Sequence, residues 1–99
     1  MAKFDVYRLG DGGLHLLDCQ ADLLDVLNTR LVVPLMPVED APVPAARLNP
    51  VFVIAGGEYV MVTQFAASIS VSELTQRVVS LAEHDIAIGN ALDMLISGF

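Results

Sequence analysis

The feature that most constrains this 99-residue chain is the periodic apolar stretch at its C-terminal end, Ser80 to Phe99. Spacings of three and four residues place one seam of side chains together: Leu81, Asp85, Ile88, Leu92, Leu95 and Phe99. That period is helical. Ser80 and Glu83 form a capping-box pattern, and Gly98 stands where a helix ends in the left-handed conformation. We therefore predict one long C-terminal helix, whose apolar tip needs cover from a partner.

The rest of the chain predicts strands. Alternating or apolar runs predict five or six short strands, over Lys3–Leu9, Leu14–Cys19, Leu31–Met36, Val51–Ile54, Glu58–Phe65 and Ala66–Val71. Ala55-Gly56-Gly57 is predicted to be a two- or three-residue hairpin turn between the fourth and fifth of these runs. Pro34 cannot donate to a ladder, so it must face an edge, a bulge or a barrel corner. Pro37–Pro50 is the longest irregular stretch and is expected to be exposed. Strands followed by one helix, without alternation, predict an antiparallel α+β fold, a small barrel in a single domain over residues 1–99.

Composition narrows the classes of partner. Five basic residues against twelve acidic ones give a net charge of −7, which repels nucleic acid and favours a cationic protein partner. The hydrophobic fraction of 55% is high for so short a chain and predicts an oligomer interface, most simply that of a twofold homodimer. The single cysteine, Cys19, fits a reducing cytoplasm. No run is long enough to cross a bilayer, and the first residues do not resemble a signal peptide.

Catalytic and cofactor patterns are weak. The chain has no phosphate-binding or dinucleotide-binding glycine motif and no paired cysteines, so we expect no metal and no cofactor. His15 and His84 are better explained as ordinary histidines than as a metal ligand or a general base, and Cys19 as a structural thiol. Asp85 in the helical seam either lies at its wet margin or pairs with an arginine, Arg30 or Arg77.

Several segments together resemble one family, the CcdB toxins of toxin–antitoxin modules. The segment Asp18–Asp25 is similar to the family's V-Q-S-D-hydrophobic-hydrophobic stretch, and Asn28–Leu35 to its R-hydrophobic-V-I-P-L strand. Further similar segments follow in the same order: Leu48–Pro50, Glu58–Thr63, Ala66–Val71 (with Ser70 at the family's proline) and Ala91–Phe99. The likeness covers essentially the whole chain.

The resemblance implies a fold and a mechanism. The fold would be a small SH3-like barrel, shared with MazF-type toxins, with an extra short sheet and the C-terminal helix. The family forms a dimer in which the helix ends meet, here at Leu95 and Ile96. It is not enzymatic: it binds the DNA gyrase A subunit through its last three residues, here Ser97, Gly98 and Phe99, and traps cleaved DNA. Ser97 replaces the tryptophan of the best-known plasmid member.

A CcdA-like antitoxin, whose disordered tail wraps the toxin, is the other partner that the resemblance implies. The matching segments are two exposed connections, with these residues: Leu9, Gly10, Asp11, Gly12, Gly13, Ala41, Pro42, Val43, Pro44 and Arg47. Two alternatives remain open. One is a MazF-like ribonuclease on the related barrel, which the net charge and scattered arginines disfavour. The other is a dimer that binds its antitoxin but has lost activity against gyrase.

Overall fold

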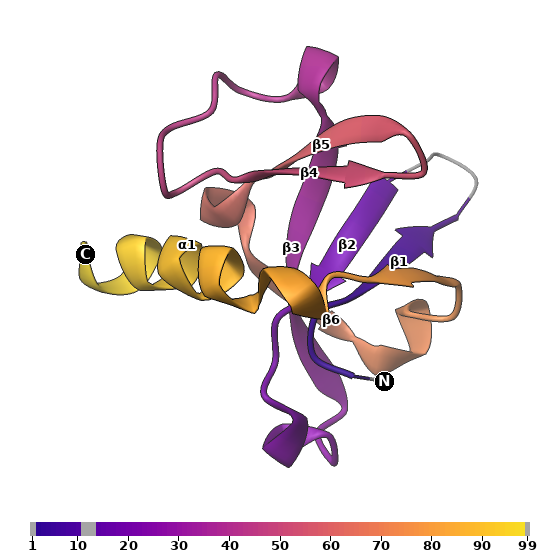
Figure 1. Ribbon diagram of the computed structural model, residues 1–99. Helices are drawn as coiled ribbons and strands as arrows, with labels where there is room; N and C mark the ends of the chain where they lie inside the picture. The colour runs from indigo at the N-terminus through magenta and orange to yellow at the C-terminus, as the bar shows by residue number, and fades with distance from the viewer. Residues whose placement is uncertain (1, 11–13, 99) are drawn as a thin grey trace.

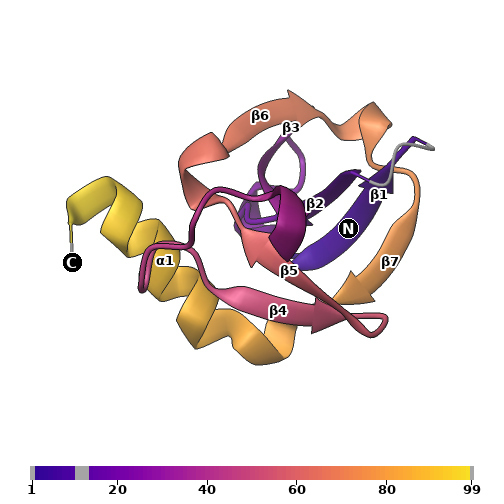
Figure 2. The ribbon, with the colours of Figure 1, turned by 90° about the horizontal axis from the view of Figure 1, so that it is seen from above.

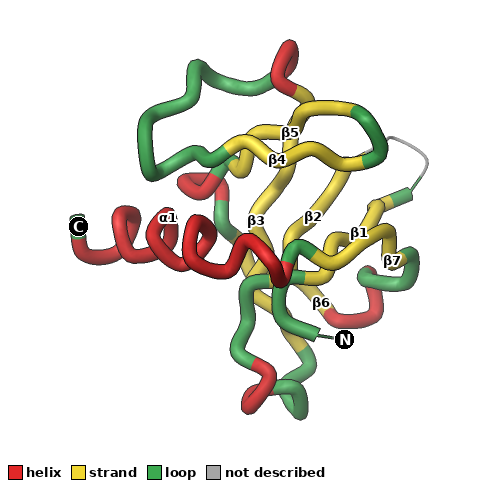
Figure 3. The backbone as a smooth tube through the Cα atoms, viewed as in Figure 1, coloured by secondary structure: helices red, strands yellow, loops and turns green. Residues whose placement is uncertain are grey.

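The structure is a computed structural model that describes residues 2–10 and 14–98. Within this part, seven strands precede one α-helix (Figures 1 and 3). The elements are β1 (Asp5–Leu9), β2 (Leu14–Asp18), β3 (Thr29–Pro37), β4 (Val51–Ile54), β5 (Gly57–Met61), β6 (Ala67–Ser70), β7 (Arg77–Ser80) and α1 (Asp85–Ser97). Short 3-10 turns lie between them, at Asp22–Leu24, Val38–Asp40, Thr63–Phe65, Val71–Glu73 and Ala82–His84.

Strand β3 is the centre of the sheet. The strand order is β4-β5-β3-β2-β1-β7, with β6 also paired to β3, and every pairing is antiparallel. β2 runs along one side of β3, while the other side pairs first with β6 and then with β5. Seen from above, the strands curl around a common axis (Figure 2). The predicted α+β class, a curled antiparallel half-barrel with one C-terminal helix, is confirmed.

Pro34 lies where β3 changes partner. It falls between Val32, the last residue paired with β6, and Leu35, the first paired with β5. Its carbonyl accepts a hydrogen bond from the Val62 N–H at 2.9 Å. Because the N–H and C=O of one residue in an antiparallel strand point to the same side, the missing N–H of Pro34 faces this break in the ladder. The sequence predicted an edge, a bulge or a barrel corner at Pro34, and the structure shows a break between two strand partners of β3.

The β4–β5 hairpin closes through a two-residue turn. Ile54 pairs with Gly57, and Ala55 and Gly56 between them have φ values of 52° and 82°. Two positive φ values are typical of the type I′ turn that matches the twist of a hairpin. The predicted hairpin is thus confirmed, but β5 ends at Met61, not at Phe65, because the chain turns into the 3-10 turn Thr63–Phe65.

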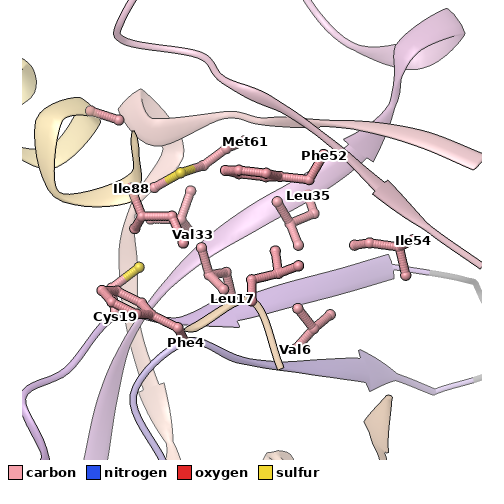
Figure 4. Close-up of a cluster of buried hydrophobic side chains, with 12 residues drawn as sticks. Phe4, Val6, Leu17, Cys19, Val33, Leu35, Phe52, Ile54, Met61 and Ile88 are labelled. Carbon is pink, nitrogen blue, oxygen red and sulfur yellow. The ribbon is translucent and has the colours of Figure 1, made fainter. Parts of the chain in front are cut away.

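The sheet carries a core on each face, since successive residues of a strand point to opposite sides. The first core joins the sheet to the hairpin and the helix (Figure 4); its buried members are Phe4, Val6, Leu17, Cys19, Val33, Leu35, Phe52, Ile54, Met61, Leu81, Ile88 and Ala91. The second core lies on the other face and consists of Tyr7, Leu16, Val32 and Leu74. Two cores explain why β3 is apolar on both faces.

The predicted start of the helix is wrong. Ser80 ends β7, where it pairs with Asp5 of β1, and its hydroxyl accepts from the Ala82 N–H at 3.1 Å without capping a helix. The α-helix begins five residues later, at Asp85. The local capping-box pattern is overridden because β7 pairs with β1. β7 was not predicted from the sequence. The predicted end is confirmed: Gly98 has φ 78°, and its N–H bonds to Met94 O at 3.0 Å.

Candidate functional site

The exposed end of α1 is the first candidate surface. Ile88 and Ala91 are buried in the first core, and Leu92 packs against it. Beyond them the helix projects from the body of the molecule (Figure 1), so that Leu95 is 42% exposed and Ile96 77% exposed. Ser97 and Gly98 are exposed as well, and Phe99 lies outside the described residues. The helix tip therefore presents apolar and small side chains without being needed for the core.

The connection before β4 is the second candidate surface. Pro42, Val43, Pro44 and Arg47 are exposed, Val43 by 92%, whereas Ala41 is half-buried. In both Figure 1 and Figure 2 this connection runs beside α1. The predicted exposure of these residues is confirmed, although the predicted contact with an antitoxin stays a prediction.

The end of β1, which leads into the β1–β2 connection, lies on the other side of the molecule (Figures 1 and 2). Leu9 ends β1 and is half-buried, and Gly10 is exposed with φ 61°. The other predicted residues of this connection, Asp11, Gly12 and Gly13, lie outside the described residues. The structure thus does not bring the two predicted antitoxin segments together. A ligand that contacts both must cross the molecule, whose longest axis measures 33 Å.

Two of the five cationic side chains are paired with carboxylates, one of them in the interior and one at the surface. Arg30 and Asp18 form a buried ion pair, in which Nη2 lies 2.6 Å from Oδ2 and Nε lies 3.0 and 3.2 Å from the two carboxylate oxygens. The Arg77 Nε lies 3.2 Å from the Asp5 carboxylate. Burial, and then the nearby Asp5 carboxylate, raise the pKa of the Tyr7 phenol beside these pairs.

Asp85 belongs to neither of these pairs. It is exposed, and its carboxylate accepts the backbone N–H of Ile86 at 2.9 Å. Of the two interpretations of Asp85, the wet margin of the seam is confirmed. The two arginines that were candidate partners are used elsewhere, and neither is free to line a basic groove.

The weak catalytic candidates have structural explanations. Cys19 is buried in the first core, and desolvation raises the pKa of its thiol to about 12, so the thiol stays protonated and unreactive at neutral pH. The His15 ring packs against Tyr59 and the His84 ring against Phe52, each with centroids 4.9 Å apart. Within residues 2–10 and 14–98, no three side chains of the metal-binding types gather at one place. None of the helices described is long and apolar enough to span a membrane.

One exposed apolar surface has no counterpart in the sequence-based predictions. The turn after β2 exposes four large side chains, Leu23, Leu24, Val26 and Leu27, two of them by 90% and 84%. Gln20 fixes the turn: its Nε2 donates to Leu24 O and its Oε1 accepts from the Leu31 N–H, both at 3.1 Å. Clusters of this kind mark contact surfaces. The signal in the sequence was a run of leucines and a valine in a turn that also contains Asp22 and Asp25.

A family model described as CcdB protein matches residues 3–98, nearly the whole chain. The chain belongs to the CcdB family. The resemblance predicted from the sequence is thereby confirmed, and the chain is a toxin of a toxin–antitoxin module. The CcdB family is not a family of catalytic enzymes. No protein of curated function matches the chain significantly.

Proposed function

We propose that this CcdB-family toxin binds the DNA gyrase A subunit through Ser97, Gly98 and Phe99 and traps the cleaved-DNA complex. The observation that carries the proposal is the helix tip: α1 leaves the body of the molecule and ends at an exposed glycine. A glycine allows a partner to approach the backbone closely, and an aromatic residue after it can serve as an anchor. A protein contact of this kind needs no catalytic group on the toxin.

The toxin acts as a homodimer. Leu95 and Ile96 expose apolar surface one turn before the tip, and a second copy of the helix is the occupant that would cover it on both chains at once. A stable dimer of this size needs an interface of ~1,200–2,000 Å² in total. Twofold symmetry then places two tails next to each other, so each target contact is made twice.

A CcdA-like antitoxin neutralises the toxin in the cytoplasm by binding the connections at Leu9–Gly13 and Ala41–Arg47. The end of β1, which leads into the first connection, and the second connection lie on opposite sides of the molecule, which supports a long extended ligand. At about 3.3 Å per extended residue, roughly ten residues are needed to cross 33 Å. With a charge of −7 on the toxin, such a tail should carry several Lys or Arg residues.

The charge distribution disfavours a MazF-like ribonuclease. A ribonuclease on this barrel needs free arginines to hold phosphates, and Arg30 and Arg77 are paired with Asp18 and Asp5. The remaining cations among the described residues are scattered over separate segments, at Lys3, Arg8 and Arg47. The described cations therefore form no basic groove that could bind RNA.

The test is to delete Ser97–Phe99 and to compare the variant with Ile86→Ala, an exposed apolar residue on the first turn of the same helix. We expect the truncated toxin to keep its melting temperature and its antitoxin, and to lose toxicity and the trapping of gyrase–DNA complexes. Phe99→Ala alone should weaken gyrase binding by ~2 kcal/mol or more if Phe99 is a hot spot. Ile86→Ala should change neither the toxicity nor the binding to gyrase.

Two outcomes would contradict the proposal. If the truncated protein stays folded and fully toxic, the tail is not the effector and another surface is. If the intact chain, expressed without antitoxin, is harmless and traps no gyrase, the dimer has lost this target.

A further inference from the structure

Arg47 has an unusual backbone conformation for an exposed side chain. Among the described residues, three that are not glycine have positive φ: Phe4, Ala55 and Arg47 at 68°. Phe4 is buried in the first core, and Ala55 forms the hairpin turn. The Arg47 side chain is exposed and packs in neither core. The left-handed conformation costs a residue with a Cβ about 1–2 kcal/mol, so packing does not explain an arginine here.

Asn49 holds the turn that carries Arg47. Its Oδ1 accepts from the Ala45 N–H at 3.0 Å, and its own N–H donates to Ala45 O at 2.9 Å, which closes the turn on itself. Its Nδ2 donates to Met61 O at 3.0 Å and to Gln64 Oε1 at 2.8 Å. The turn is therefore fixed to the end of β5 and the 3-10 turn after it, with Arg47 at its apex.

Arg47 is also the least engaged cation of an acidic protein. Arg30 and Arg77 are ion-paired, Arg8 bonds to Gln76 at 3.4 Å, and the Lys3 ammonium lies over the Phe4 ring at 4.8 Å. Arg47 makes no hydrogen bond or ion pair to the part of the chain described. Against a net charge of −7, one unengaged guanidinium on a turn held by Asn49 is a distinct feature. It would repel a mostly cationic ligand unless that ligand also carried an acidic group.

We propose that Arg47 binds one carboxylate of the antitoxin tail and that Asn49 is the positioning residue that aims it. The inference rests on the proposed antitoxin site. The guanidinium suits a carboxylate because it offers two parallel N–H donors. General attraction between a cationic tail and an acidic toxin sets no alignment, whereas one cation carried on a fixed turn selects where a single acidic residue of the tail must lie. Arg47 thus sets the register of the tail.

The experiment uses the full-length toxin and the tail peptide of the antitoxin from the same module, with each Asp or Glu changed in turn to Asn or Gln. Arg47→Gly removes the guanidinium and relieves the positive φ. We expect it to keep or raise the melting temperature and to weaken tail binding at least about tenfold, as losing a charge-assisted hydrogen bond does. Lys3→Gln removes the same charge elsewhere and should change the affinity by less than about twofold.

One amide substitution in the tail should weaken binding to the wild-type toxin as much as Arg47→Gly does, and should have no further effect on that variant. Asn49→Ala should weaken binding in part and speed hydrogen exchange of the Ala45 amide. Arg47→Lys should not restore full affinity, because an ammonium cannot form the paired contact.

The outcomes separate this inference from the site on which it rests. If Val43→Asp weakens tail binding and Arg47→Gly does not, the site stands and the role of Arg47 is wrong. If neither variant weakens binding, the antitoxin binds elsewhere and the proposed site fails. If Arg47→Gly weakens binding but no acidic position of the tail couples to it, the carboxylate is the wrong partner.

Discussion

The buried Asp18–Arg30 pair allows a sharp test of the fold. Arg30 is 1% exposed and Asp18 is fully buried, so neither charge reaches water. Replacing Arg30 with Met keeps much of the side-chain volume and removes the cation. The Asp18 carboxylate then retains one hydrogen bond, from the Gln20 N–H at 3.1 Å.

A buried ion that loses its partner destabilises a protein by ~3–5 kcal/mol. The total stability of a small domain is typically about 5–15 kcal/mol, so Arg30→Met should remove about a fifth of it or more. Asp18→Leu should cost a similar amount, because it leaves the guanidinium unpaired. The double variant Asp18→Leu/Arg30→Met buries no charge. It should fall within about 1 kcal/mol of the wild type or exceed it, since apolar replacements of buried pairs are often neutral or stabilising. The Arg30 Nη1, which has no partner in the described part of the chain, already weakens the case for the native pair.

Urea unfolding followed by circular dichroism measures all four free energies. The two single variants and the double variant form a cycle whose coupling energy should be at least ~3 kcal/mol. Equal slopes with denaturant are the control that the unfolded states match. If the two single losses simply add in the double variant, the charges do not depend on each other, and the interpretation of a paired, water-excluded site is refuted.

Three further predictions follow from burial and from backbone conformation. Ile88 is fully buried between α1 and the sheet, so Ile88→Ala should lower the free energy of unfolding by ~2–5 kcal/mol. A melting temperature near that of the wild type would show that the helix does not support the core. The pKa of Cys19 is raised from 9.0 to about 12, so the folded state holds its proton longer than the unfolded state. The contribution of Cys19 is therefore complete below pH 9 and lost as the pH rises from 9 towards 12. Cys19→Ala should flatten that alkaline loss in pH-dependent unfolding, and an unchanged slope would contradict the assignment. Gly98→Ala should cost about 1 kcal/mol through the positive φ alone, visible as a small drop in melting temperature, while Ser97→Ala next to it should have little effect.

Sequence patterns predicted those parts of the fold that depend on residues close together in the chain. The turn at Ala55-Gly56-Gly57 and the helix end at Gly98 are fixed by backbone conformations that few residues adopt, and both were predicted. β7 was missed because its four residues form a strand only by pairing with β1, some seventy positions earlier in the chain. The Ser80–Glu83 pattern then predicted a helix start too early.

The candidate sites show the same limit. The exposure of the tail and of the Pro37–Pro50 connection followed from apolar periodicity and from proline content. The fixed turn at Arg47 did not, because Asn49 is held by Met61 and Gln64, which come from a separate element. The Asp18–Arg30 pair likewise joins two strands and was not predicted. In the sequence analysis Arg30 was instead a possible partner of Asp85.

The separation of the helix base from its tip has an evolutionary consequence. Ile88 and Ala91 are held in the first core, so changes there are paid for in stability. Ser97 and Gly98 lie outside every packed cluster of the described chain, so only the positive φ of Gly98 links the tip to the stability of the fold. Mutations at the tip are thus largely hidden from selection on folding. With the target contact that we propose for the tail, the same scaffold can drift towards a different target surface by changing a few terminal side chains, while its strands remain untouched.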